Sequence, residues 1–336
     1  MKAVVVGAGN MGSIHARAWK SQDGVEVAVV CDVDMDRAVK LAAEVGATAE
    51  PSYERALERP DIDVVSVCTP ANLHPAVACY ALDHGKHVLT EKAIALTLEE
   101  ADRMIEAARR NGRHLGVSYQ YRCFEYYAEI KRRFRNGDFG SPVIARFSDV
   151  REVRPKLAMH RRSGNGGPVI DMAGHWFDLM RFITGEEPVS VSARGHVFGA
   201  GKRRLDGIED LAVDAADIQV AMSGGHILSA YVNWGMPEGF AGAGDFTITG
   251  PEMHVSMTDG TVVARYRGRK EVWSDFTTAF PTATAGRVAD VIRAIRTGEP
   301  PEVSGIEGRR ALEVCLAALE SIKRGAEVKL GDASRA

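Results

Sequence analysis

The chain has 336 residues, enough for two domains that each bury their own core. Hydrophobic residues make up 45% and charged residues 26% of the sequence, as in globular proteins. The formal net charge of -3 gives no electrostatic reason to expect nucleic acid or an anionic membrane as partner. No apolar run approaches the ~20 residues that a bilayer-spanning helix needs. We therefore expect neither a nucleic-acid nor a membrane partner.

The cysteines and the start of the chain indicate the compartment. The five cysteines form no CxxC pair and are interpreted as reduced thiols. The first apolar run begins three residues after Met1, which leaves no room for a signal peptide. We expect a cytoplasmic protein.

The first twelve residues, MKAVVVGAGNMG, predict a strand, a glycine turn and the start of a helix. The three glycines of the spacing GxGxxG have separate roles. Gly7 allows a tight turn, Gly9 allows a pyrophosphate to approach the backbone closely, and Gly12 allows the helix to pack close to the strand. The helix start offers backbone N–H groups and a partial positive charge to phosphates. The turn residues expected to bind a dinucleotide are Gly7, Gly9, Asn10, Met11 and Gly12.

A second apolar run, Val25–Cys31, ends at Asp32, about twenty residues beyond the turn, where a carboxylate accepts hydrogen bonds from the adenosine ribose. Asp34 and Asp36 follow and would repel a ribose 2′-phosphate, so NAD is favoured over NADP. Arg37 is the nearest cation. Binding of the 2′-phosphate of NADP by Arg37 is the alternative.

Strands and helices alternate along residues 1–120, which predicts an NAD(P)-binding Rossmann domain with a doubly wound parallel sheet. Further strands are expected at Val64–Cys68, Lys86–Leu89 and His114–Ser118, and helices at Asp36–Val45, Tyr53–Glu58, His74–His84 and Thr97–Asn111. Ligands should lie at the carboxyl ends of these strands.

Residues 121–336 predict an α+β domain for substrate binding and oligomerisation. Helices are expected at Tyr126–Arg135, Ala285–Arg296 and Ile306–Arg324. Extended runs, many of them alternating, lie at Val143–Val153, Val189–Val197, Val213–Met222, His226–Trp234, Asp245–Thr249, Glu252–Met257 and Thr261–Arg267. They predict a large, mostly antiparallel open sheet, whose bare face we expect a second subunit to cover in a homo-oligomer, a dimer or tetramer.

Two segments outside the glycine turn carry chemistry. Thr90-Glu91-Lys92-Ala93 follows a predicted strand, where an ammonium can bind the nicotinamide ribose and a substrate hydroxyl. An ordinary surface lysine is the alternative.

The second segment is a glycine-rich loop, Gly164–Gly167, that enters a helix running to about Phe182. Asp171 and His175 are four residues apart and share a helix face, which makes the imidazole a candidate general base. The alternative is a polar pair on a solvated helix face. With no cysteine nearby, we expect no metal site.

These motifs resemble the glucose–fructose oxidoreductase, inositol dehydrogenase and rhizopine catabolism (Gfo/Idh/MocA) family of NAD(P)-dependent oxidoreductases. The resemblance rests on GAGNMG, Cys68-Thr69-Pro70, Glu91-Lys92, GGPVIDMAGHWFD and the closing helix pair. The family signature Glu-Lys-Pro has Ala93 in place of its proline.

The resemblance implies a catalytic set of Lys92, Asp171 and His175, in which histidine takes the hydroxyl proton, lysine binds the substrate oxygen and aspartate orients both. Residues expected at the nicotinamide end of NAD are Thr69, Pro70, Asn72, His74, Glu91 and Lys92, although His74 could equally cap its own helix.

Candidate substrate contacts, besides Asp171 and His175, are Tyr119, Arg122, Arg154, His160, Arg161, Arg162 and Trp234. Three of them, Arg154, Arg161 and Arg162, could bind a carboxylate or phosphate on a sugar, or form an exposed basic loop. Trp234 could stack on a sugar or pack in the core.

The sequence thus predicts an NAD-dependent dehydrogenase acting on a secondary hydroxyl of a cyclic polyol or sugar, of the inositol or aldose type. Alternatives are an NADP(H)-linked sugar or nucleotide-sugar ketoreductase and a non-catalytic cofactor-binding regulator. The regulator would lack the lysine or the histidine.

Overall fold

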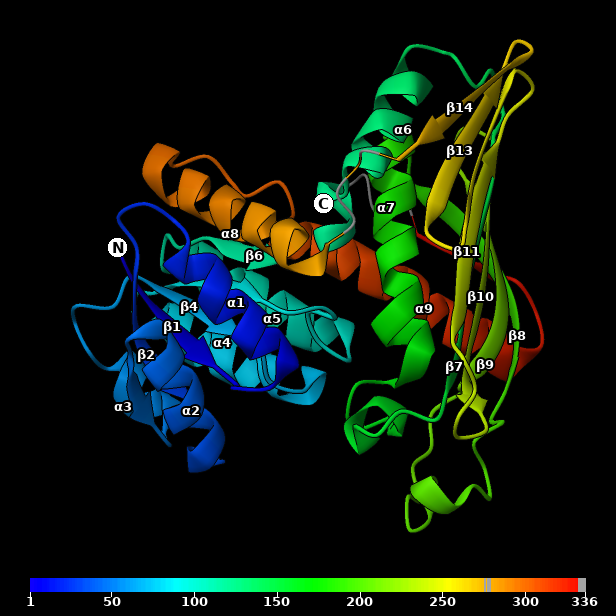
Figure 1. Ribbon diagram of the computed structural model, residues 1–336. Coiled ribbons are helices and arrows are strands. Elements are labelled where there is room, and N and C mark those ends of the chain that lie inside the picture. Colours follow the sequence, from blue (N-terminus) through cyan, green and yellow to red (C-terminus); the bar gives the residue numbers. More distant parts are fainter. Residues whose placement is uncertain (275, 277–278, 332–336) are drawn as a thin grey trace. The chain divides into compact units, whose positions relative to one another are not determined.

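The computed structural model describes residues 1–274, 276 and 279–331. The chain forms two compact units: unit 1 is Met1–Cys123 with Thr278–Arg310, and unit 2 is Phe124–Thr277 with Ala311–Ala336 (Figure 1). The sequence predicts a single boundary near residue 120. The first crossing lies close to it, but the chain also returns to unit 1 near its end.

Unit 1 is built on a six-stranded parallel sheet in the order β3-β2-β1-β4-β5-β6. The order reverses between β1 and β4, which is the switch point where doubly wound sheets bind ligands. The predicted Rossmann sheet is confirmed. Its strands are β1 (Lys2–Val6), β2 (Glu26–Cys31), β3 (Thr48–Glu50), β4 (Val64–Val67), β5 (His87–Thr90) and β6 (Leu115–Val117).

The helices of unit 1 begin where their sequences provide caps. Asp34, Ser52 and Thr97 each accept a backbone N–H three residues ahead, and Gly46 ends α2 in the left-handed conformation. The elements are α1 (Asn10–Lys20), α2 (Met35–Val45), α3 (Tyr53–Leu57), η1 (Ala71–Leu73), α4 (His74–Asp83), α5 (Leu98–Arg110) and η2 (Gln120–Cys123).

Helix α8 (Phe280–Thr297) belongs to unit 1 although it lies near the end of the sequence. It packs on α1, and Val288 and Val291 are fully buried in one cluster with Trp19 and Val5. The large indole of Trp19 is fully buried, and α8 contributes apolar side chains to the same cluster.

Unit 2 contains a nine-stranded sheet in the order β14-β13-β12-β11-β7-β10-β9-β8-β15. Every pairing is antiparallel except that of β10 with β7. The predicted mostly antiparallel sheet is confirmed, with β14 and β15 as additional edge strands. The strands are β7 (Ile144–Glu152), β8 (Pro188–His196), β9 (Ala215–Met222), β10 (Ile227–Met236), β11 (Ala243–Thr249), β12 (Met253–Thr258), β13 (Thr261–Tyr266), β14 (Arg269–Trp273) and β15 (Val328–Lys329).

Helices cover one face of this sheet. Phe147 on β7 stacks on Trp176 with ring centroids 5.6 Å apart, and the ring centroid of Tyr127 lies 5.3 Å from that of Phe246. The helical elements are α6 (Glu125–Arg135), η3 (Leu157–His160), η4 (Val169–Ala173), α7 (Gly174–Thr184), η5 (Arg203–Leu205) and α9 (Gly305–Arg324), which runs from unit 1 into unit 2.

The opposite face of the sheet carries no helix among the described residues of unit 2 (Figure 1). Ile144 and Ile227, which are register partners on β7 and β10, are 42% and 40% exposed there, and Tyr231 is 39% exposed. Across the described part of the chain, no helix has the length and apolarity needed to cross a bilayer.

Candidate active site

The glycine turn after β1 has the geometry that its spacing predicts. Gly7 has φ +99°, and a Cβ there would lie 2.7 Å from the carbonyl oxygen of Cys68. A Cβ on Gly12 would overlap the carbonyl oxygen of Gly7, whereas a Cβ on Gly9 would meet nothing within 4 Å. Gly7 and Gly12 are therefore required for packing, and Gly9 borders open space.

Asp32 fixes this turn from the end of β2. Its Oδ2 accepts the backbone N–H of Ala8 at 2.6 Å, and its Oδ1 accepts that of Asp34 at 2.9 Å. Each carboxylate oxygen has a second acceptor site, so ribose hydroxyls can still bind. Arg37 forms an ion pair with Asp34 at 3.0 Å, which engages the nearest cation within the protein.

The carboxyl ends of β1 and β4 provide donors that suit a dinucleotide. Helix α1 begins at Asn10, with no side-chain cap at Gly9 and no acidic residue in its first turn, so its first N–H groups can bind phosphate. Beyond β4, the buried Oγ1 of Thr69 has no hydrogen-bond partner among the described residues. The open space at Gly9, these N–H groups and this hydroxyl fit NAD.

The other residues after β4 differ in their surroundings. His74 is buried and its ring nitrogens lie 2.7 Å from the carbonyl oxygen of Ala93 and 3.0 Å from that of Thr69. The ring therefore links the loop after β4 to the segment after β5. Pro70 precedes η1, and Asn72 is exposed on it.

A buried network joins α1 to the end of β5. The ring of His15 lies 2.9 Å from both Ser66 Oγ and Glu91 Oε1, and the indole of Trp19 donates to the same serine at 2.7 Å. Burial alone lowers the pKa of His15, but the sulfur of Cys68 and the carboxylate of Glu91 outweigh it and raise this pKa to about 10. The ring of His15 therefore ties Glu91, at the end of β5, to α1.

Lys92 follows this anchored glutamate and is partly exposed beyond the carboxyl end of β5. Because Glu91 is held by His15, the backbone next to Lys92 is fixed to α1. The peptide bond between Lys92 and Ala93 is cis.

In unit 2, the glycine-rich loop leads into a π-helical turn, η4, and then into α7. Hydrogen bonds in such a turn span five residues, and single π turns often occur at functional sites. Asp171 lies in this turn and His175 in the first turn of α7. Both side chains are 3% exposed and Asp178 is 1% exposed, so these residues do not form a solvated helix face.

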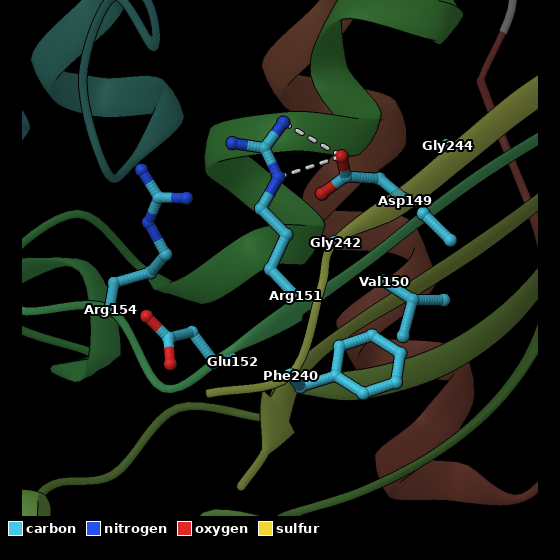
Figure 2. Close-up of a pocket in the computed structure, with 9 residues that line it drawn as sticks. Asp149, Val150, Arg151, Glu152, Arg154, Phe240, Gly242 and Gly244 are labelled. Atoms are coloured by element: carbon cyan, nitrogen blue, oxygen red, sulfur yellow. Dashed lines mark hydrogen bonds and ion pairs between the residues drawn. The ribbon is translucent and has the colours of Figure 1, made fainter. Parts of the chain in front are cut away.

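A pocket of about 480 Å³ lies within unit 2 at the ends of β7 and β11 (Figure 2). Asp149 accepts the indole N–H of Trp234 at 2.6 Å and pairs with Arg151 at 2.7 Å. The guanidinium carbons of Arg151 and Arg154 lie 5.6 and 6.0 Å from the centroid of the Trp234 ring. The pocket is lined by Asp149, Val150, Arg151, Glu152, Arg154, Phe240, Gly242, Ala243 and Gly244.

The three arginines predicted to bind an anion have different surroundings. Arg154 lines the pocket, whereas Arg161 and Arg162 contact Asp210. His160 is buried, and its Nε2 accepts the backbone N–H of Arg154 at 2.8 Å. Burial lowers the pKa of His160, and the charges of Arg154 and Arg204 lower it further, so the ring is neutral and able to accept. Arg161 lies 3.9 Å from Asp210, and Arg162 is exposed with its N–H donated to the carbonyl of Asp210.

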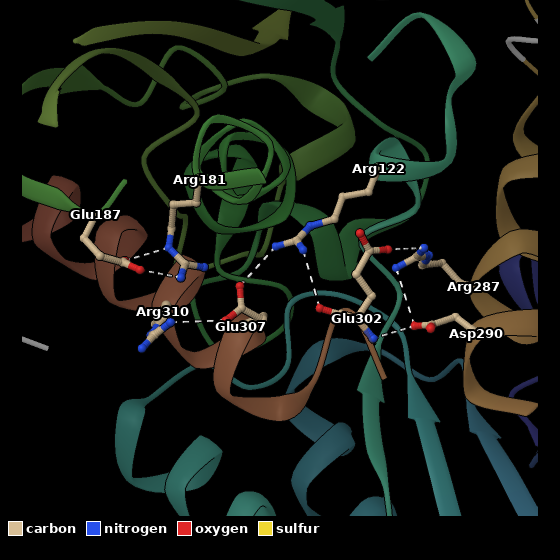
Figure 3. Close-up of polar contacts among 8 residues, drawn as sticks. All are labelled: Arg122, Arg181, Glu187, Arg287, Asp290, Glu302, Glu307 and Arg310. Atoms are coloured by element: carbon tan, nitrogen blue, oxygen red, sulfur yellow. Dashed lines mark hydrogen bonds and ion pairs between the residues drawn. The ribbon is translucent and has the colours of Figure 1, made fainter. Parts of the chain in front are cut away.

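Tyr119 and Arg122 belong to unit 1, where Tyr119 is 1% exposed. Arg122 forms an ion pair with Glu307 at 3.1 Å, and nearby Arg287 pairs with Glu302 at 2.8 Å (Figure 3). Within unit 1, the first contact joins η2 to the start of α9, and the second joins α8 to the loop ahead of α9.

Three residues of these sites, His15, Asp149 and Arg151, were not predicted from the sequence. A signal existed for the two strand residues, because charged side chains at 149 and 151 continue the inward-facing positions 145 and 147 of β7. His15 had a weaker signal, one polar residue at a helix position that the periodicity predicts to be buried.

Comparisons with known proteins agree with this geometry. Residues 1–119 match the model of the "Oxidoreductase family, NAD-binding Rossmann fold", and residues 127–263 match the GFO/IDH/MocA C-terminal domain. The chain belongs to the Gfo/Idh/MocA family. It is therefore an oxidoreductase whose N-terminal domain binds NAD, which confirms the resemblance and the expected cofactor.

Among its relatives, the chain is 30% identical to a myo-inositol 2-dehydrogenase of Thermotoga maritima, over 98% of both chains. It is 29% identical to a scyllo-inositol 2-dehydrogenase (NAD(+)) of Bacillus subtilis, over 100% of this chain and 98% of the relative. An aldose-aldose oxidoreductase from Caulobacter crescentus shares the fold, with a TM-score of 0.85 at 22% identity over 98% of this chain and 99% of that one.

Proposed function

We propose that this oxidoreductase is an NAD-dependent dehydrogenase that oxidises a secondary hydroxyl of a cyclic polyol or sugar. The observation that carries the proposal is the burial of Asp171 in η4 and of His175 in the first turn of α7, because a buried imidazole four residues from a carboxylate is suited to proton transfer. The inositol dehydrogenases among the relatives support the substrate class.

The roles follow from the residue types. Bound NAD would supply the acceptor for the hydride that leaves the carbon carrying the hydroxyl. An imidazole nitrogen of His175 takes the hydroxyl proton. The ammonium of Lys92 donates a hydrogen bond to the substrate oxygen and stabilises the negative charge that develops there. Asp171 contacts the substrate and orients the other two groups.

Unit 1 is proposed to bind NAD through the glycine turn, Asp32 and the loops after β4 and β5. Unit 2 is proposed to bind substrate at the pocket beside Trp234. Of the three arginines predicted to bind an anion, Arg154 lines this pocket, whereas Arg161 and Arg162 lie on the segment paired with Asp210.

The experiment is reduction of NAD and NADP, side by side, by a panel of inositols, aldoses and sugar acids, followed at 340 nm. His175→Ala is the blank, with Asp171→Asn as a second variant. We expect NADH formation with at least one compound and a loss of at least ~100-fold in both variants. Equal rates in wild type and His175→Ala would contradict the assignment of the base.

The same panel separates the alternatives. Turnover with NADP alone, or in the reductive direction alone, would indicate a ketoreductase of sugars or nucleotide sugars. Tight NAD binding with no turnover on any compound would indicate a cofactor-binding regulator.

We infer that the protein is a homo-oligomer through the open face of the nine-stranded sheet. Exposed apolar side chains on adjacent strands, Ile144 and Ile227 among them, support a second copy as the occupant. Light scattering should give a dimer or tetramer for the wild type and a smaller species for Ile227→Asp. A monomeric wild type would contradict the inference.

We also propose that the protein acts in the cytoplasm, and all five of its cysteines are free thiols in this structure. Fractionation of source cells should recover it with cytoplasmic marker enzymes. Recovery from a secreted or periplasmic fraction would contradict this assignment.

A further inference from the structure

Arg154, in the unit 2 pocket, carries a charge that the described part of the chain does not neutralise. Its guanidinium is partly buried, and none of the described carboxylates lies within the 4.0 Å of an ion pair. Its Nε is buried and has no hydrogen-bond partner among the described residues. An arginine taken partly out of water without a counter-ion costs folding free energy, so it requires an explanation.

The carboxylates around Arg154 are engaged elsewhere. Asp149 binds Arg151 and the indole of Trp234. Glu152 accepts the backbone N–H of Gly239 at 2.6 Å and lies 4.0 Å from Arg204. Figure 2 shows the guanidinium of Arg151 turned to Asp149, while that of Arg154 has no such contact.

The position of Arg154 is fixed by its surroundings. His160, which is 1% exposed, accepts the backbone N–H of Arg154, and its own carbonyl accepts the N–H of Ala212 at 2.8 Å. The ring of Trp234 lies beside the guanidinium. The backbone of Arg154 is therefore anchored before any ligand arrives, which lowers the ordering cost of binding.

The electrostatics of the pocket favour an anion. Burial lowers the pKa of Arg154, and the neighbouring cation Arg151 lowers it further. The carboxylates of Asp149, Asp171 and Glu152 act in the opposite direction, but only over longer distances. Asp171, one of the proposed catalytic residues, is among the carboxylates that raise the pKa of Arg154. An anion that contacts Arg154 directly would supply the missing counter-charge.

We propose that Arg154 binds an anionic group of the substrate, a carboxylate or a phosphate, so that the preferred substrate is an acidic sugar or polyol rather than a neutral one. The inference rests on the proposed function, since it specifies the substrate of the same site. A guanidinium donates two parallel hydrogen bonds to either group, which gives orientation as well as affinity.

The test compares matched substrates that differ in charge, which are glucose with glucuronate and glucose 6-phosphate, and galactose with galacturonate. The wild type is compared with Arg154→Gln, Arg154→Lys and a control, Arg135→Gln, an exposed arginine of α6. Initial rates of NADH formation give kcat and KM. Calorimetry measures binding of glucuronate, glucose 6-phosphate and glucose to the protein with NADH.

We expect the wild type to favour one acidic compound over its neutral partner by at least ~100-fold in kcat/KM. Arg154→Gln should lose most of that preference, mainly through a higher KM for the acidic compound. Arg154→Lys should retain part of the preference for the acidic compound, and Arg135→Gln should retain all of that preference. Preference for glucuronate or for glucose 6-phosphate identifies the anion as carboxylate or phosphate.

Two results would overturn the inference. One is a wild type that turns over or binds neutral sugars as well as acidic ones. The other is an Arg154→Gln variant whose kcat/KM falls by the same factor for acidic and for neutral sugars. Turnover of neutral sugars alone would support the proposed dehydrogenase activity and contradict only the proposed acidic substrate. Binding of an acidic sugar without NADH formation would contradict the proposed dehydrogenase activity and support the proposed anion site.

Discussion

The glycine turn of unit 1 and the pocket of unit 2 differ in how their charged groups are paired. Around the glycine turn of unit 1, charged groups are paired within the protein: Asp32 with two backbone N–H groups, Glu91 with His15, and Arg37 with Asp34. In the unit 2 pocket, Arg154 has no such partner among the described residues. A cofactor that is recognised by backbone N–H groups needs a rigid frame, whereas selection of one substrate needs a group left available for it.

The largest effect is expected from removing the proposed electrophile of unit 1. Lys92→Ala should lower kcat by about 100- to 10,000-fold, because the oxygen of the substrate loses its stabilising cation. The Kd for NAD should change less than about threefold, because the paired groups of the glycine turn are untouched. Lys40→Ala, an exposed lysine of α2, is the control. Unchanged turnover would remove Lys92 from the mechanism.

Asp32→Ala tests the rigid frame itself. We expect NAD binding to weaken about 10- to 100-fold, since the ribose loses its acceptor and the turn loses two internal hydrogen bonds. Binding of NADP should weaken less, because the repulsive carboxylate is also removed. Fluorescence titration with NADH and NADPH measures both, with Asp23→Ala, an exposed residue ahead of β2, as control. An equal loss for both cofactors would mean that Asp32 does not bind the ribose.

His15→Gln tests the buried pair that anchors Glu91. The pKa of His15 is raised from 6.5 to about 10 in the folded protein, so its stabilisation is complete below pH 6.5 and is lost as the pH rises to about 10. The variant should therefore be less stable by about 1–3 kcal/mol at pH 6, and the difference should shrink toward pH 10. Urea unfolding across this range measures it, with the exposed His84→Gln as control. A difference that stays constant with pH would contradict a charged His15.

The smallest effect is expected from changes at His160, whose ring accepts the backbone N–H of Arg154. The pKa of His160 is lowered by burial, so the hydrogen bond to the Arg154 backbone persists below pH 6.5 and is lost only as the pH falls through the lowered value. We expect the KM for an acidic substrate to rise a few-fold as the pH falls below 6.5 and through that lowered pKa. In His160→Gln this rise should be absent. Identical pH profiles would mean that His160 does not position Arg154.

The features that could be predicted from the sequence depend on local chemistry. The GxGxxG spacing, the strand that ends at Asp32 and the capping residue Thr97 each fix a short segment, and each has the expected geometry. The strands of unit 2 were recognised by their alternation. Asp171 and His175 were singled out because they are close in sequence, and their catalytic role stays a prediction.

The features that were missed depend on tertiary contacts. The helical pattern of α8 indicates an apolar face but does not specify that this face packs on Trp19. Parallel pairing of β10 with β7 cannot be derived from the alternation of either strand. Arg154 stood out only as one of several arginines, because its lack of a counter-ion is a property of the folded pocket.

The most direct test of the account follows hydrogen from the substrate. A polyol or sugar from the panel is deuterated at the carbon that carries the reacting hydroxyl and incubated with protein and NAD. The account predicts that deuterium appears in NADH by mass spectrometry, with a slower initial rate than for unlabelled substrate, and that His175→Ala transfers at least ~100-fold less. Formation of NADH without deuterium, or equal transfer by His175→Ala, would contradict hydride transfer assisted by this site.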